Sequence, residues 1–228
     1  MAINVNQVYK AVLVVLQQEK RGVLTPTEFN KIATQAQQEI FTEYFDELNQ
    51  LLRQPQTSLA YADRYALLDE KISLFKTTDT LTINASKVSV PTQVQELGTV
   101  VYNNREVQRI QKYEVYTTNI SPLTAPTSFY PVYTYEDSVI ELYPTLTGSL
   151  TLNFLKFPAD VKWGFTIDTE LGNYIYSAQA STDFEIHKSD QPLLIDKILG
   201  YAGVMSRDQL ALQLSASKEQ QIDIDGQK

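Results

Sequence analysis

A single amphipathic helix of unusual length dominates the first part of the sequence. A capping box marks its start, because the Thr25 hydroxyl can accept the backbone N–H of Glu28 while the Glu28 carboxylate reaches back, and Pro26 stands where no backbone donor is needed. Apolar residues then recur at steps of three and four up to Arg53, before Pro55 interrupts the pattern. At about 1.5 Å per residue the predicted helix is roughly 40 Å long, several turns more than the average globular helix.

Two further helical patterns flank the long helix. Apolar residues at helical spacing predict a first helix over residues 3–19, which Gly22 ends. Apolar positions that alternate steps of four and three predict a third helix over residues 61–75. Because short connections join these helices, we expect residues 1–76 to form an N-terminal helical bundle.

The composition changes after Lys76, where threonine, valine and isoleucine become frequent, with asparagine, serine and glycine between them. Residues 77–188 are therefore expected to form a central antiparallel β region. A hairpin is predicted from strands over 132–135 and 139–143, which turn at Glu136, Asp137 and Ser138. Strict alternation predicts a further strand over 148–158, and we expect it to share a sheet with the hairpin. The apolar positions of that strand are Leu150, Leu152 and Phe154.

Two segments of the β region lack a clear strand pattern. Residues 117–131 contain three prolines and are too long and polar for an ordinary connection, so we expect an extended surface loop. Residues 168–190 are ambiguous, and we expect a loop followed by a strand near 183–187.

The C-terminal part, residues 189–228, is expected to pack with the N-terminal bundle as one compact unit. Apolar spacing predicts a helix over 189–202 that stops at Gly203. A second capping box at 206–209 predicts another short helix, followed by a polar tail from Lys218. The expected fold class is therefore α+β, with two short C-terminal helices.

Composition excludes several classes of protein. The longest apolar run, Ala11 to Leu16, is too short for a membrane span or a signal peptide, so we expect a soluble protein that is not secreted by that route. The absence of cysteine excludes disulfides and thiolate metal sites. A formal net charge of -8 with scattered basic residues disfavours a surface that grips nucleic acid tightly.

Catalytic and cofactor motifs are not recognisable. The single histidine, His187, has no serine or cysteine nucleophile in a known frame and is interpreted as a surface or strand-end residue. Neighbouring carboxylates could in principle bind a metal, but they fall in predicted turns, loops and a chain end. These pairs are Glu136 and Asp137, Asp168 and Glu170, and Asp223 and Asp225. The glycines match neither nucleotide-binding pattern. The sequence therefore predicts no catalytic residue, no cofactor and no metal.

Aromatic residues leave two interpretations open. The chain has 14 tyrosines, several near the predicted hairpin, and tyrosine suits protein interfaces and sugar platforms as well as half-buried sheet positions. Trp163 could likewise stack on a sugar or fill the core.

Two segments are candidate protein interfaces. In the proline-containing segment, Pro122, Leu123 and Pro126 are the candidate contacts, since prolines limit the entropy lost on docking. In the tail, Ile222 and Ile224 have strand-like spacing and could add an edge strand to a partner's sheet; a solvated tail is the alternative.

The chain as a whole resembles a virion structural protein of crAss-like bacteriophages and related marine podoviruses. The resemblance rests on the residue patterns of three stretches and on their order along the chain. They are "NVNQVYKAVLVVLQQEKRGVLTPTEFNKIATQAQQEIFTEYFDELN", "SPLTAPTSFYPVYTYEDSVIELYPTLTGSLTLNFLKFPADVKW" and "STDFEIHKSDQPLLIDKILGYAGVMSRDQLALQL". Within them, the helix start at Thr25, the 131–144 hairpin and the Trp163 region match the family pattern.

The resemblance implies a non-enzymatic ring protein of the head-to-tail connector, similar in plan to the adaptors of short-tailed phages. It implies assembly with itself, commonly twelve-fold, contacts with the portal protein and with other connector or tail proteins, and DNA that passes through the channel without tight binding. It further implies a virion location after synthesis in the bacterial cytoplasm. A tail-tube or hub ring, a carbohydrate-binding appendage module and an enzyme are the alternatives.

Overall fold

The computed structural model describes residues 3–18, 24–53, 59–170 and 172–205, and it divides the chain into two compact units. Unit 1 comprises Met1–Leu74 and Pro158–Lys228, and unit 2 comprises Phe75–Phe157. Unit 2 is thus an insertion in the sequence of unit 1. The predicted β region of residues 77–188 spans both units, because its last part packs with the helices of unit 1.

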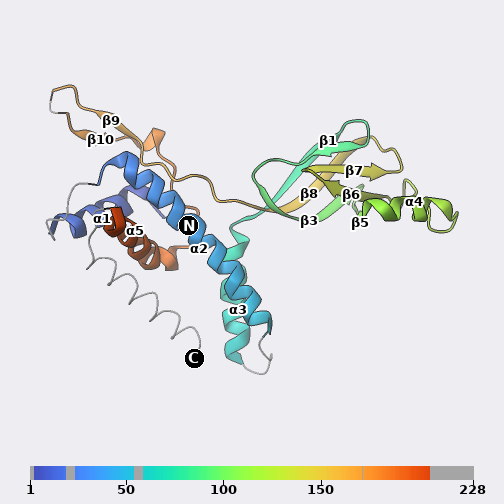
Figure 1. Cartoon of the computed structure of the whole chain (residues 1–228), viewed down its shortest axis with the longest axis horizontal. Helices are drawn as coiled ribbons and strands as arrows, with labels where there is room; N and C mark the ends of the chain where they lie inside the picture. The colour runs from blue at the N-terminus through green and yellow to red at the C-terminus, as the bar shows by residue number, and fades with distance from the viewer. Residues whose placement is uncertain (1–2, 19–23, 54–58, 171, 206–228) are drawn as a thin grey trace. The chain divides into compact units, whose positions relative to one another are not determined.

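The described part of unit 1 contains four α-helices. Figure 1 labels each of them. They are α1 (Val5–Gln18), α2 (Pro26–Arg53), α3 (Leu59–Ser73) and α5 (Gln191–Met205). The long helix α2 packs against both α3 and α5, and α1 packs against α5. The fold class is therefore α+β with a helical N-terminal part, as the sequence predicts.

The predicted capping box of α2 is confirmed. The Thr25 backbone N–H donates to Glu28 Oε2 at 2.9 Å, and the Glu28 N–H donates to Thr25 Oγ1 at 3.4 Å. Hydrogen bonds from Thr25 lower the pKa of the Glu28 carboxyl, in keeping with an anion at a helix N-terminus. The apolar face of the helix is buried as the spacing predicts, through Phe29, Ile32, Ala33, Ala36, Ile40, Phe41, Tyr44 and Leu51.

Helix α5 does not stop at Gly203 as predicted but continues to Met205. Both Gly200 and Gly203 are buried, so these glycines lie in the packed part of the helix instead of ending it. Lys197 lies between two carboxylates of α2 and approaches Glu43 at 2.7 Å and Glu39 at 3.2 Å. The second predicted C-terminal helix and the tail lie outside the described residues.

The strand predicted near 183–187 is wrong. Phe184 forms only an isolated antiparallel bridge with Ile3. The buried Gln37 side chain of α2 takes the place of a strand partner here, donating to the Ala159 carbonyl at 2.7 Å and accepting the Glu185 N–H at 2.9 Å. The ambiguous segment instead contains a short hairpin of β9 (Phe165–Ile167) and β10 (Tyr174–Tyr176), followed by the 3₁₀ turns η1 (Ala178–Ala180) and η2 (Lys188–Asp190).

A polar cluster joins α2, α3 and η2 within unit 1. Tyr44 donates its hydroxyl proton to Asp190 Oδ2 at 2.5 Å, and Lys71 Nζ lies 2.9 Å from Asp190 Oδ1. The Lys71 ammonium also lies 5.3 Å from the centre of the Tyr44 ring. Burial, and then the hydrogen bond to Asp190, raise the pKa of the Tyr44 hydroxyl far above its ordinary value.

This cluster predicts a loss of stability at alkaline pH. Above about pH 10 the Tyr44 hydroxyl ionises in the unfolded chain but keeps its proton in the folded protein, because its pKa is raised by folding. The unfolded state is therefore favoured as the pH rises, and the contribution of Tyr44 to the free energy of unfolding is lost. Urea unfolding at pH 8, 10 and 11 should show the difference in unfolding free energy between wild type and Tyr44→Phe shrinking by about 1.4 kcal/mol per pH unit above pH 10. A difference that stays constant up to pH 11 would contradict the assignment.

Unit 2 consists of two four-stranded sheets around one core. The first has the order β1 (Lys76–Ile83), β8 (Gly148–Lys156), β3 (Val94–Tyr102), β4 (Arg105–Glu106). The second has the order β2 (Lys87–Ser89), β7 (Val139–Tyr143), β6 (Val132–Glu136), β5 (Gln108–Arg109). All neighbouring strands are antiparallel except β5 and β6.

The predicted hairpin is confirmed as β6 and β7, and its turn residues Asp137 and Ser138 have φ values of 48° and 59°, as a tight hairpin turn requires. The expectation that this hairpin shares a sheet with β8 is wrong, because β8 lies between β1 and β3 in the other sheet. The two elements share a core and not a sheet. The predicted inward positions of β8, Leu150, Leu152 and Phe154, are buried in that core.

The segment predicted as a loop over 117–131 begins inside a helix, α4 (Lys112–Ile120). The Glu114 carboxylate accepts the Gln111 N–H at 2.9 Å, and the Thr118 hydroxyl donates to the Glu114 carbonyl at 2.6 Å. The first of these hydrogen bonds satisfies a backbone donor at the N-terminus of a helix that the loop prediction missed. Within the described residues, no helix combines the length and apolar character of a membrane span.

Candidate assembly surface

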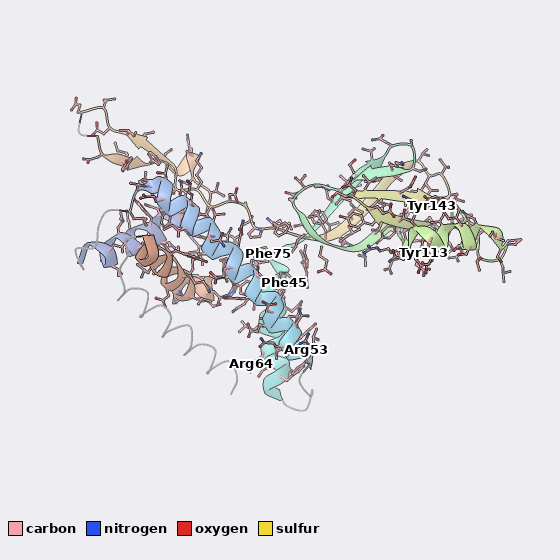
Figure 2. The ribbon with its side chains drawn as sticks, viewed as in Figure 1. Phe45, Arg53, Arg64, Phe75, Tyr113 and Tyr143 are labelled. Atoms are coloured by element: carbon pink, nitrogen blue, oxygen red, sulfur yellow. The ribbon has the colours of Figure 1, made fainter. Side chains whose placement is uncertain are left out.

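Helix α4 and the segment after it expose an unusual number of large apolar side chains. Six of them leave 67–96% of their surface accessible, and we call them the α4 surface: Tyr113, Tyr116, Ile120, Leu123, Phe129 and Tyr130. Figure 2 labels Tyr113 and shows side chains projecting along the helix. Val115 is the buried residue of α4. Exposed apolar residues are normally scattered singly, so a group on one short element marks an interaction site.

The segment after α4 is ordered by its own hydrogen bonds. The backbone N–H groups of Thr124 and Ala125 both donate to the Ser121 carbonyl, at 3.1 and 2.9 Å. Thr127 and Tyr130 exchange backbone hydrogen bonds at 3.3 and 3.1 Å. The segment therefore holds its shape while its large side chains stay exposed.

Of the predicted interface residues, Pro122, Leu123 and Pro126 lie in this segment. Pro122 is exposed, Leu123 is the most exposed member of the α4 surface, and Pro126 is half-buried. Ile222 and Ile224 lie outside the described residues.

Arg105 of β4 connects the α4 surface to the first sheet. Its guanidinium lies over the rings of Phe129 and Tyr130, at 5.3 and 5.5 Å from their centres, and its Nη1 donates to the Phe129 carbonyl at 3.2 Å. The guanidinium has five N–H donors, and the Arg105 residue is exposed. Arg105 thus places a positive charge beside the aromatic residues of the α4 surface.

The first turn of α4 is joined to the second sheet by charge. Lys112 Nζ lies 2.6 Å from Glu136 Oε2 at the end of β6, and this hydrogen bond raises the pKa of the Lys112 ammonium. Both side chains are exposed, so the pair orients the helix more than it stabilises the fold.

No protein-family model and no curated protein matches this chain. The function of the α4 surface is therefore argued from its own chemistry. Its residue types are those that dominate protein interfaces, in which tyrosine, phenylalanine and arginine are enriched at the energetic centre.

The sequence contains a signal for this surface that our prediction missed. Tyr113, Tyr116 and Ile120 stand at steps of three and four, as in any amphipathic helix. Such a stripe normally faces the core of its own chain, and only the structure shows that here it faces solvent.

The aromatic residues considered for sugar stacking or for the core differ in burial. Trp163 is 4% exposed, its indole N–H donates to Asn6 Oδ1 at 3.2 Å, and its ring lies 4.5 Å from that of Tyr9, so it fills the core of unit 1. The tyrosines near the hairpin are divided, with Tyr133 buried, Tyr135 half-buried and Tyr130 exposed.

The histidine has a local structural contact. His187 Nδ1 accepts the Ser189 N–H at 3.3 Å as the N-cap of η2, and it lies 2.7 Å from Ser189 Oγ. The serine is held between the histidine and Asp190, which is not the order of a catalytic triad. Among the described residues, no three His, Cys, Asp or Glu side chains are grouped as a metal site requires.

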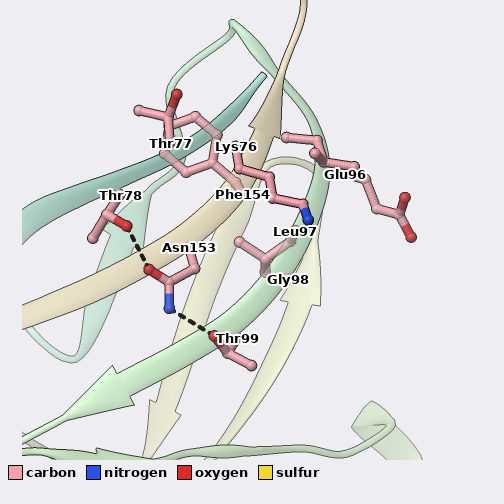
Figure 3. A pocket seen from close by; sticks show the side chains of 10 residues that line it. Lys76, Thr77, Thr78, Glu96, Leu97, Gly98, Thr99, Asn153 and Phe154 are labelled. Atoms are coloured by element: carbon pink, nitrogen blue, oxygen red, sulfur yellow. Dashed lines mark hydrogen bonds between the residues drawn. The ribbon is translucent and has the colours of Figure 1, made fainter. Parts of the chain in front are cut away.

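A groove of about 540 Å³ is lined by residues of strands β1, β8 and β3 in unit 2. Figure 3 shows the side chains that line it. Asn153 accepts from the Thr78 hydroxyl and donates to Thr99 Oγ1, both at 2.7 Å. A bulge in β3 opens the groove, and a Cβ at Gly98 would lie 2.9 Å from the Asn153 carbonyl oxygen. The groove is lined by hydroxyl and amide groups, three of which hydrogen-bond to one another, and by the charged residues Lys76 and Glu96.

Proposed function

We propose that this protein is a non-enzymatic virion structural protein that forms a ring in the head-to-tail connector of a phage, around the DNA channel. The α4 surface is the observation that carries the proposal, because exposed aromatic and aliphatic side chains beside an arginine are the chemistry of a protein contact. The sequence resemblance supplies the identity of the assembly, with the portal protein and other connector or tail proteins as neighbours.

The long helix and the charge balance also support this proposal. Helix α2 spans 28 residues and buries one face in its own unit, while residues of its opposite face, such as Gln38 and Thr42, are exposed among the described residues. The formal net charge of -8 suits a protein that surrounds DNA without holding it, since tight binding needs clustered lysine and arginine. The virion would be its location, after synthesis in the bacterial cytoplasm.

The test is to remove the exposed segment without touching the core. Deleting residues 122–128 should leave the melting temperature nearly unchanged. The only large apolar side chain removed is Leu123, which is exposed, and Phe129 and Tyr130 are kept. Light scattering should show closed high-order species for wild type, alone or with the portal protein, and monomers for the deletion.

A matched control separates this effect from any surface change. Tyr65→Asp alters a tyrosine of α3 that is 42% exposed and lies outside the α4 surface, so it should assemble as wild type does. Normal assembly of the deletion variant, or a large loss of its stability, would contradict the role given to residues 122–128 as an assembly contact. Binding to a tail protein without binding to the portal would favour a tail-tube or hub ring.

A further inference from the structure

The β9–β10 hairpin, which we call the arm, is a second exposed apolar feature. Ile167, Tyr174 and Ile175 leave 47–61% of their surface accessible. The two strands pair over three positions and form a two-stranded sheet of their own. Such a short hairpin is marginally stable by itself, so further burial would stabilise it.

The base of the arm is fixed to unit 1. Trp163 lies 6.0 Å from Phe165 and 5.6 Å from Tyr176, one residue on each strand. Gly164 allows a close approach here, because a Cβ at this position would lie 2.5 Å from the Ala180 backbone. The orientation of the arm relative to α1 and α2 is thus set by packing.

The arm and the α4 surface are complementary in charge. Residues 165–176 contain Asp168 and Glu170 and no lysine or arginine. The Arg105 guanidinium lies beside the α4 surface, over the rings of Phe129 and Tyr130. One chain therefore carries an acidic apolar hairpin in unit 1 and, in unit 2, an aromatic surface with the Arg105 guanidinium beside it, although Glu106 and Glu114 lie close to that arginine in the sequence.

We propose that the arm of one copy docks on the α4 surface of a neighbouring copy, with Glu170 facing Arg105. The inference rests on the proposed function, since it names the contact through which copies assemble. Two different surfaces meet in such a contact, so each copy keeps one of each available, and repetition closes a ring when the rotation permits. Opposite charges at the contact would fix its register and favour the correct partner.

Cysteine cross-linking tests the contact directly, because the chain has no cysteine of its own. Tyr116→Cys and Ile175→Cys proteins, mixed and oxidised, should form disulfide-linked dimers that contain one copy of each variant. The control pair, Tyr65→Cys with Ile175→Cys, should give at least about tenfold less dimer. Equal yields from the two pairs would overturn the docking.

Charge exchange provides the second test. Arg105→Glu and Glu170→Arg should each weaken self-assembly about tenfold or more, because like charges then face each other. Mixing the two variants should restore assembly, since alternate copies pair the introduced charges with each other and the native charges with each other. Failure of mixing to restore assembly would overturn the docking.

The two tests also separate this inference from the proposed function. If wild type assembles and both charge variants assemble equally well, the docking is wrong and the ring proposal stands. If wild type stays monomeric at all concentrations and with the portal protein, both are wrong.

Discussion

Phe41→Ala is expected to lower the free energy of unfolding by about 3–5 kcal/mol, the usual cost of truncating a buried phenylalanine. Phe41 is 2% exposed on the apolar face of α2, and its ring contacts that of Phe45 at 5.0 Å between centres. Such a loss is a large part of the stability of a typical domain. Urea unfolding measures this loss of unfolding free energy. Insoluble protein on expression would indicate a loss large enough to prevent folding.

Leu52→Ala is the matched control for this variant, because Leu52 lies on the same helix and is 53% exposed. Its cost should stay within about 1 kcal/mol. If Phe41→Ala folds with normal stability but does not assemble, this face of α2 is an interface and its assignment to the core is wrong.

Trp163→Ala is expected to have an effect of similar size, about 3–5 kcal/mol. The indole is buried against Tyr9, and Trp163 also holds the base of the arm through Phe165 and Tyr176. Its loss should therefore destabilise unit 1 and also reduce assembly. Urea unfolding and light scattering measure the two effects.

Trp163→Phe should recover part of the stability, since a smaller ring remains while the hydrogen bond to Asn6 is lost. If the arm directs assembly, this variant should also recover assembly. Full stability of Trp163→Ala would contradict the core role of the indole.

Local patterns made the helices of the first third and the β6–β7 hairpin predictable. The α2 capping box involves residues three apart, and the hairpin turn involves neighbours, so the chemistry that determines each is contained in a few residues. The burial of Phe41 and of Leu152 also follows from period alone.

Long-range pairing was not predictable in the same way. The alternation of β8 shows that one face is buried, but not that β1 and β3 are its neighbours. At Glu185 a hydrogen bond to the Gln37 side chain takes the place of a bond to a neighbouring strand. The spacing of apolar residues in the sequence does not indicate such a side-chain contact. The candidate surface was found only in part, because a helical stripe such as Tyr113 and Tyr116 has the same spacing whether its own chain or another covers it.

Because unit 2 is inserted in the sequence of unit 1, the two units can evolve at different rates. The backbone N–H of Lys156 donates to the Phe75 carbonyl at 2.9 Å, so the chain leaves for the inserted unit and returns from it at two paired positions. A segment whose ends lie side by side can be lengthened, shortened or exchanged without stretching the host. The helical host could thus be inherited with little change while the inserted module diversifies to match new neighbours.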